Sequence, residues 1–260
     1  MAQKEEGLLA RLSPRSRANR KKQKQIDAFV DGRISAAREV DLTYGKIPQD
    51  KVLDMVLASD MEKIRLTLEQ ADRQAFDLAV DMLLRAETIY VTGIRSCAPL
   101  ASFLSFFLHQ IFPDVRLVST SSMEEIFEQL IRIRPSDVLI GISFPRYSMR
   151  TLKAMEFANT HSAGTISITD SIHSPMNLYS SCNLIAKSDM ASIVDSLVAP
   201  MSLINALIVA LCIRRQKEVG AYLRADDAFW DEFQFYRRDE LNLADEDADI
   251  ALIDPGKEHT

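Results

Sequence analysis

The sequence predicts an α/β protein, a doubly wound five-stranded parallel sheet preceded by helices. Short, apolar, β-branched runs recur through residues 87–219 and alternate with helical patterns, which is typical of a parallel sheet covered on both faces. Two of these runs, residues 88–93 and 137–142, are followed by small and polar residues and then by a helical pattern. Right-handed crossovers between such strands place helices on both sides of the sheet.

Residues 1–47 form a segment of their own, which Gly45 and Pro48 separate from the rest. Seven basic side chains crowd one stretch of it: Arg11, Arg15, Arg17, Arg20, Lys21, Lys22 and Lys24. Two interpretations stay open, a remnant DNA-binding arm that contacts phosphates and a solvated, disordered tail. No aromatic residues interleave with these charges, which favours the tail.

Residues 48–86 are predicted to be linking helices, because apolar residues recur three and four positions apart. Asp60 is expected to cap a second part of this helical segment. Packing on a core explains the pattern most simply. A dimer contact, or a lever between two domains, is the alternative.

Residues 87–219 contain the strands and helices of the predicted sheet. The strands are expected at residues 88–93, 115–119, 137–142, 165–169 and 183–187, and the helices at 96–112, 122–133, 147–162 and 193–218. Ser122 and Glu125 have the spacing of a capping box. The last helix is expected to be mostly buried and to be interrupted by Pro200.

Residues 220–260 combine aromatic and acidic residues, which predicts a docking helix followed by an acidic tail.

The net charge of −6 gives no global argument for nucleic-acid binding. Three scattered cysteines without metal-ligand spacing suggest reduced thiols in the cytoplasm. The longest apolar run, residues 197–213, is too short and too interrupted for a membrane span, so neither metal, cofactor nor membrane is expected.

The candidate site lies where the first and third strands end. Ser96 and Ser143 follow these strands, and the carboxyl ends of parallel strands meet at the ligand-binding edge of a sheet. Free backbone N–H groups at the following helix starts favour an anion there, although helix capping alone would also explain serines. Four neighbouring side chains, and one from the start of the last helix, complete the candidate set: Arg95, Arg146, Tyr147, Ser148 and Ser196.

No catalytic residue is predicted. Aldose–ketose isomerisation needs a general base, usually Glu or His. His109 and His161 fall late in predicted helices, and His173 is best explained as a solvent-facing turn residue. A binding module is therefore favoured over an isomerase.

Residues 87–219 resemble a sugar isomerase (SIS) domain, and more closely the sensor domain of MurR/RpiR-type transcriptional regulators. The resemblance rests on three phrases: Ser-Phe-Pro-Arg-Tyr-Ser at 143–148, Thr-Asp-Ser at 169–171 with Ser-Pro at 174–175, and Asp-Ser-Leu-Val-Ala-Pro at 195–200. It implies a homodimer or homotetramer whose phosphosugar effector alters DNA binding. A sugar-phosphate isomerase, or an interaction protein without a ligand, is the alternative.

The resemblance also implies that Ser96, Ser143 and Ser148 bind the phosphate. This sequence departs from the family pattern at three positions of the second loop, where Pro145, Arg146 and Arg150 replace serine, glycine and glutamate. Arg146 could supply a cation in place of the lost hydroxyl. The family usually carries about 75 residues of helix-turn-helix domain before the linker, which residues 1–47 do not reproduce.

Overall fold

Five parallel strands form one sheet in a computed structural model of the chain. The structure describes residues 49–120, 122–188 and 196–233, the last seven by their helical backbone alone. The strands are β1 (Ile89–Gly93), β2 (Val115–Val118), β3 (Val138–Ile142), β4 (Gly164–Thr169) and β5 (Cys182–Ile185). They lie in the order β2-β1-β3-β4-β5, and every neighbouring pair is parallel. The predicted fold class is confirmed, with strand bounds that differ by one or two residues.

β1 and β3 occupy the middle of the sheet, and every residue of both strands is buried. Because both faces of these strands are buried, their sequences are continuous apolar runs. Their register aligns Ile89 with Val138 and Gly93 with Ile142. The two strands therefore end side by side, and the loops that follow them start from the same place.

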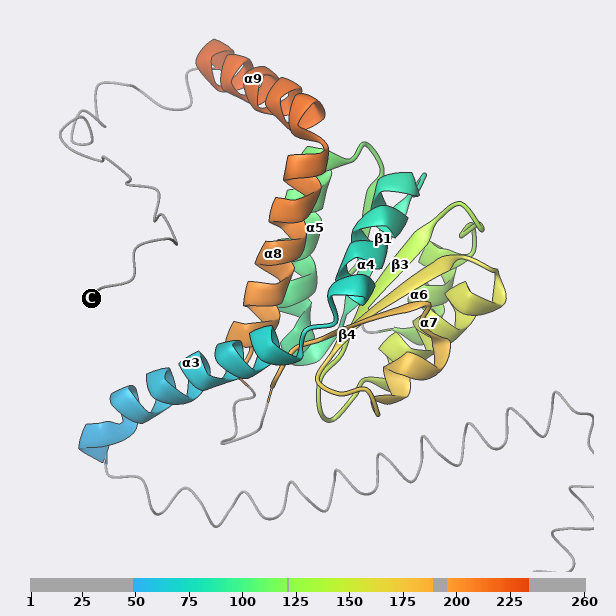
Figure 1. The fold of residues 1–260 in the computed structure, drawn as a ribbon. Coiled ribbons are helices and arrows are strands. Elements are labelled where there is room, and N and C mark those ends of the chain that lie inside the picture. The colour runs from blue at the N-terminus through green and yellow to red at the C-terminus, as the bar shows by residue number, and fades with distance from the viewer. Residues whose placement is uncertain (1–48, 121, 189–195, 234–260) are drawn as a thin grey trace, which may run out of the picture. The chain divides into compact units, whose positions relative to one another are not determined.

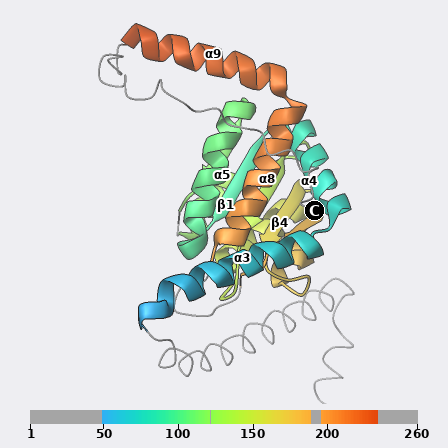
Figure 2. The ribbon, with the colours of Figure 1, turned by 60° about the vertical axis from the view of Figure 1, so that its left-hand side comes forward.

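Helices cover both faces of the sheet (Figure 1), and Figure 2 shows the face on which α4, α5 and α8 lie. One face carries α4 (Arg73–Arg85), α5 (Ala98–Ile111) and α8 (Val198–Arg214), and the other carries α6 (Met123–Leu130) and α7 (Met149–Thr160). In α5 three fully buried leucines recur every four residues, Leu100, Leu104 and Leu108. This spacing is the amphipathic pattern that the sequence displays.

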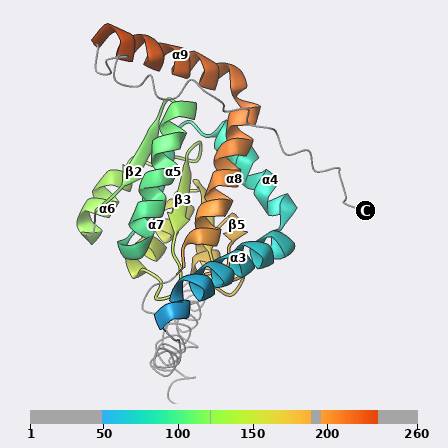
Figure 3. The same ribbon diagram turned by 90° about the vertical axis from the view of Figure 1, so that its left-hand side faces the viewer.

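The linking segment consists of two helices, α3 (Val52–Gln70) and α4, after a short 3-10 turn at Gln49–Lys51. The predicted cap at Asp60 is wrong, because α3 continues through it and Asp72 caps α4 by accepting from the N–H of Ala75 at 3.0 Å. Figure 3 shows α3 crossing α8. The Thr67 hydroxyl of α3 accepts from the N–H of Lys187 at 2.9 Å, which attaches α3 to the end of β5.

The single helix predicted at residues 193–218 is wrong. α8 begins at Val198 and ends at Arg214, and residues 189–195 lie outside the described part. Pro200 does not interrupt α8, because it lies in the first turn, where its missing N–H has no intrahelical partner to lose. Directly after the end of α8, the guanidinium of Arg215 donates to the carbonyl of Ile111 at 3.2 Å.

Residues 1–216 form one compact unit, and residues 217–260 belong to a second. The second unit contains α9 (Gln216–Phe233) apart from its first residue, and α9 includes the predicted aromatic positions Phe229 and Trp230. The basic cluster of residues 11–24 and the acidic tail of residues 239–254 lie outside the described residues. In the described part, no single helix is long and apolar enough to cross a membrane, and only the bent pair of α8 with Gln216–Asp226 meets that test by length and composition.

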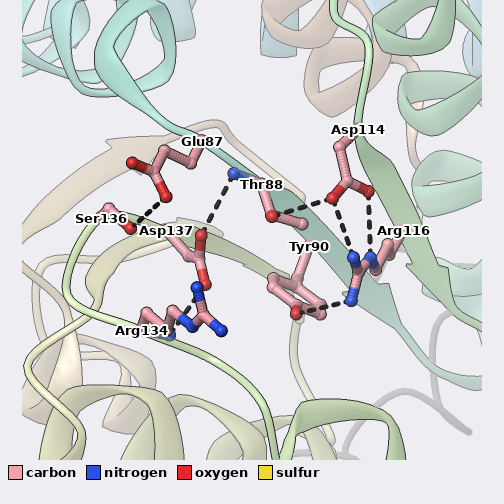
Figure 4. A network of polar contacts seen from close by, with 8 residues as sticks. All are labelled: Glu87, Thr88, Tyr90, Asp114, Arg116, Arg134, Ser136 and Asp137. Carbon is pink, nitrogen blue, oxygen red and sulfur yellow. Dashed lines mark hydrogen bonds and ion pairs between the residues drawn. The ribbon is translucent and has the colours of Figure 1, made fainter.

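The amino-terminal edge of the sheet is closed by a polar network (Figure 4). Asp137 accepts from the backbone N–H groups of Thr88 and Arg134, at 3.2 and 2.8 Å, which ties the start of β1 to the loop before β3. Asp114 accepts from the guanidinium of Arg116 at 2.8 and 3.0 Å, and this hydrogen bonding lowers the pKa of the Asp114 carboxyl. Thr88 also donates through its hydroxyl to Asp114 at 3.0 Å, so the network ties the starts of β1, β2 and β3 together.

Candidate functional site

The first loop of the site follows β1 and turns very tightly. A Cβ at Gly93 would lie 2.7 Å from the carbonyl oxygen of Cys97, so only glycine fits at this close approach. A 3-10 turn, Arg95–Cys97, then leads into α5. Arg95 has a φ of 61°, and both Arg95 and Ser96 are exposed.

The second loop follows β3 and is braced by its own serines. The Ser143 hydroxyl is buried and accepts from the N–H of Ser148 at 3.0 Å. The Ser148 hydroxyl accepts from the N–H of Thr151 at 3.4 Å and so caps α7. Between these serines Arg146 is exposed, with a φ of 63°.

The two loops meet in one cavity of about 140 Å³. Its lining comes from both of them: Ile94, Arg95, Ser96, Cys97, Ser143, Phe144, Pro145, Arg146 and Ser148. The chain leaves β1 for β2 on one side and passes to β3 on the other, so the cavity lies at the topological switch point of the sheet. Ligands of open α/β sheets bind at such a point.

The chemistry of the cavity favours an anion. Three hydroxyls and two guanidinium groups line it, and no Asp, Glu or His is among its lining residues. α7 begins directly after the second loop, and its positive dipole end adds to the attraction. A phosphate would therefore find positive charge and hydroxyls in one place.

Both arginines of the cavity hold a backbone conformation that disfavours a side chain. In the described part of the chain, three residues other than glycine have a positive φ, namely Arg95, Arg146 and Ser162. Ser162 follows the end of α7, where this conformation is a common helix ending. The other two face the same cavity, and strained residues of this kind cluster at functional sites.

Two of the seven predicted site residues lie away from the cavity. Tyr147 is buried, and its hydroxyl donates to the carboxylate of Asp170 at 2.5 Å. The Ser196 hydroxyl donates to Asp60 of α3, also at 2.5 Å. The remaining five, Arg95, Ser96, Ser143, Arg146 and Ser148, line the cavity together. Ligand contact by any of the seven stays a prediction.

Sequence reasoning missed the apolar part of the lining. Ile94, Phe144 and Pro145 are buried and complete the cavity walls. Nothing in their residue types pointed to a site, because they resemble ordinary core residues. Within the described ranges, no group of three His, Cys, Asp or Glu side chains is arranged to hold a metal ion.

Comparison with known proteins identifies this fold. The family model of the SIS domain matches residues 82–210. The sugar isomerase domain of an RpiR transcription factor from Sphaerobacter thermophilus superposes with a TM-score of 0.66 and 26% identity, over 68% of this chain and 99% of that one. NanR of Vibrio vulnificus, solved in complex with ManNAc-6P, has the same fold, with a TM-score of 0.62 and 18% identity, over 74% of this chain and 72% of that one.

A regulator from Haemophilus influenzae is similar in sequence. This uncharacterized HTH-type transcriptional regulator is 23% identical over 173 residues, which cover 65% of this chain and 58% of the regulator. The match therefore spans little more than half of that relative. Residues 82–210 of the present chain therefore form a SIS domain, and this α/β domain resembles the sugar isomerase domain of an RpiR transcription factor.

Proposed function

We propose that this protein is a cytoplasmic, phosphosugar-sensing transcriptional regulator of the MurR/RpiR type. It binds a sugar phosphate at its SIS domain, and the bound ligand changes its affinity for DNA. The observation that carries the proposal is the cavity between the loops after β1 and β3, where Ser96, Ser143 and Arg146 come together without a neighbouring carboxylate in the lining.

The cavity suits the phosphate of such a ligand better than the whole molecule. Its volume of about 140 Å³ is below the roughly 300 Å³ at which pockets for complete small ligands begin. The phosphate therefore enters the cavity and the sugar extends past the exposed Arg95 and Arg146. NanR, which shares the fold, is complexed with a sugar phosphate, which supports this ligand class.

The transcriptional part of the proposal rests on the relatives and on the basic segment. Both RpiR and the Haemophilus protein are described as transcriptional regulators. Residues 11–24 of this chain carry seven basic side chains that suit contacts with DNA phosphates. DNA is accordingly the proposed macromolecular partner.

An isomerase is the weaker candidate, because the cavity lacks a general base. His173 is exposed in the turn after β4 and does not line the cavity. Proton transfer next to a carbonyl needs an acid or base within hydrogen-bonding reach of the substrate. No side chain of that kind is found in the cavity lining, so binding without turnover is proposed.

Isothermal titration calorimetry with the full chain tests ligand binding. Sugar phosphates, including N-acetylmannosamine 6-phosphate, are compared with the same sugars lacking phosphate. We expect binding only of phosphorylated sugars, and a loss of about 10- to 100-fold in Ser96→Ala, since a hydrogen bond to a charged group contributes about 1.5–3 kcal/mol. Ser136→Ala, at the opposite edge of the sheet, is the matched control.

DNA binding and turnover are measured separately. A fluorescence-anisotropy titration of duplex DNA with and without the bound sugar phosphate tests regulation, and NMR of the sugar phosphate tests isomerisation. A change in DNA affinity without turnover supports the proposal. Turnover would establish an isomerase, and a folded protein that binds no sugar phosphate would overturn ligand sensing.

A further inference from the structure

The arginine of the second loop is held in an unfavourable backbone conformation. Arg146 has a φ of 63°, which residues other than glycine disfavour. A residue keeps such a conformation only where its surroundings fix it. The residue after next contributes one restraint, because the N–H of Ser148 donates to the Ser143 hydroxyl. The residue directly after Arg146 contributes another.

Tyr147 anchors the loop in the core, whereas Arg146 beside it is exposed. The tyrosine ring belongs to the same hydrophobic cluster as Leu152 and Met155 of α7. Its hydroxyl donates to Asp170, the residue that directly follows β4, at 2.5 Å. The ring and its hydrogen bond together fix the position of the peptide that follows Arg146.

Asp170 is a fixed acceptor, because the loop that begins with it is closed by hydrogen bonds. The carbonyl of Ser171 accepts from the N–H of Ser174 and from the side-chain amide of Asn177, both at 3.0 Å. The Thr169 hydroxyl donates to the buried hydroxyl of Ser174 at 2.9 Å. Tyr147 is therefore bonded to a loop that is itself braced.

The bond between Tyr147 and Asp170 joins two sequence phrases that lie far apart in the chain. The first, Ser-Phe-Pro-Arg-Tyr-Ser at 143–148, supplies three polar residues of the cavity lining. The second, Thr-Asp-Ser at 169–171, supplies none. Through Tyr147, the second phrase nevertheless bears on the loop that carries Arg146.

We propose that Tyr147 and Asp170 are positioning residues of the anion cavity, and that their hydrogen bond holds Arg146 where its guanidinium meets the phosphate of the ligand. This inference rests on the proposed function, because the position of Arg146 matters to binding only if a phosphate occupies the cavity. Without the bond, the peptide after Arg146 is held less firmly and the loop spends part of its time in conformations that do not bind. The apparent affinity falls by the fraction of time lost.

A second tyrosine provides a matched control. Tyr179 belongs to the same hydrophobic cluster as Tyr147, is similarly buried, and donates to the carboxylate of Glu156 at 3.1 Å. Neither Tyr179 nor Glu156 lines the cavity. Tyr179→Phe therefore removes the same chemical group from the same cluster without loosening the second loop.

Hydrogen exchange of the full chain without ligand tests the positioning by itself. Tyr147→Phe and Asp170→Ala are expected to speed exchange in residues 144–150 by about 5- to 10-fold, as the loss of one hydrogen bond predicts. Asp170→Asn keeps an acceptor for the tyrosine and is expected to stay close to the natural rate. Tyr179→Phe is expected to leave this segment unchanged. Unchanged exchange in Tyr147→Phe overturns the proposal, whether or not the protein binds a sugar phosphate.

Calorimetry with N-acetylmannosamine 6-phosphate shows whether Tyr147 acts through Arg146. Tyr147→Phe is expected to weaken binding about 5- to 10-fold in the natural chain. In an Arg146→Ala background the same change is expected to weaken binding less than about twofold, because the side chain that Tyr147 positions is gone.

The alternative outcomes of the calorimetry separate this inference from the proposed function. Equal losses in both backgrounds, or the same loss in Tyr179→Phe, would show a general structural effect and overturn the proposal. A natural chain that binds neither this nor another sugar phosphate would overturn the proposed function, and with it the role in binding. The exchange rates of residues 144–150 would then still decide whether Tyr147 and Asp170 hold the loop.

Discussion

The hydroxyl of Ser143 accepts a hydrogen bond from the backbone N–H of Ser148 at 3.0 Å, across the loop that joins β3 to α7. Ser143 is only 2% exposed, so this bond is shielded from water. The serine predicted to contact phosphate therefore also fixes the shape of the loop that carries Arg146. Its two roles can be separated by measuring stability and binding in the same variants.

Ser143→Ala is expected to lower the free energy of unfolding by about 1 kcal/mol, because the N–H of Ser148 loses its partner. It is also expected to weaken phosphosugar binding more than Ser148→Ala, which removes the helix cap but leaves the Ser143 bond in place. Urea unfolding and calorimetry check both numbers. Equal binding by the natural chain and Ser143→Ala would show that ligand binding does not depend on the hydrogen bond between Ser143 and Ser148.

Replacing either cavity arginine by glycine is expected to stabilise the protein while weakening ligand binding. Glycine adopts a positive φ without the penalty that Arg95 and Arg146 bear, so a net gain of about 0.5 kcal/mol is expected after the entropy cost of glycine. The lost guanidinium should reduce phosphosugar affinity about tenfold or more. Thermal unfolding and calorimetry measure the two effects.

Ser162→Gly is the matched control for these arginine variants. It relieves the same backbone conformation at the end of α7, away from the cavity lining. We expect a similar gain in stability with unchanged ligand affinity. Arginine variants that gain stability and keep full affinity would show that the guanidinium groups do not contact the ligand.

Gly93→Ala is expected to disrupt the first loop more than Gly141→Ala disrupts β3. A Cβ at Gly93 would press on the backbone carbonyl of Cys97 at 2.7 Å, which cannot move without the loop. At Gly141 the nearest atom is the Sδ of Met155 at 2.6 Å, on a flexible side chain. A loss of about 1–3 kcal/mol and of ligand binding is expected for Gly93→Ala. Urea unfolding of both variants decides the order.

Cys182 is expected to make the protein less stable at alkaline pH. Its thiol donates to the carbonyl of Ala75 at 2.9 Å, and burial raises its pKa from 9.0 to about 11. A raised pKa contributes stability below the unfolded value, which is lost as the pH rises from about 9 to about 11. The loss attributable to this thiol should be at most about 2–3 kcal/mol.

Cys182→Ser isolates this effect, because serine keeps a donor for Ala75 but does not titrate in the same range. The difference in unfolding free energy between the two proteins, measured in urea at pH 8 and pH 10.5, should shrink at the higher pH. A difference that is the same at both pH values would mean that the thiol does not titrate differently in the folded chain.

The fold could be predicted because its central strands display their burial directly. β1 and β3 are apolar at nearly every position, and the polar break after each one marks the carboxyl edge. The site followed from topology, because loops after adjacent parallel strands must emerge together. Ser96 and Ser143, 47 residues apart in the sequence, accordingly line one cavity.

The features that the sequence did not reveal depend on distant partners. Tyr147 is turned into the core by Asp170, and Ser196 is held by Asp60, which precedes it by 136 residues. No local sequence pattern predicts either of these two hydrogen bonds. The start of α8 was misjudged for a local reason, since proline is tolerated in the first turn of a helix as well as at a break.

The bond between Ser196 and Asp60 fastens the helix that leads to the N-terminal segment onto the carboxyl edge of the sheet. The chain between β5 and α8 leaves that same edge, where the loops after β1 and β3 also emerge. A ligand that moves Ser196 must therefore also move α3 or break this bond, and a contact that moves α3 must do the same to Ser196. Thermodynamic linkage makes the two effects on binding free energy equal in size.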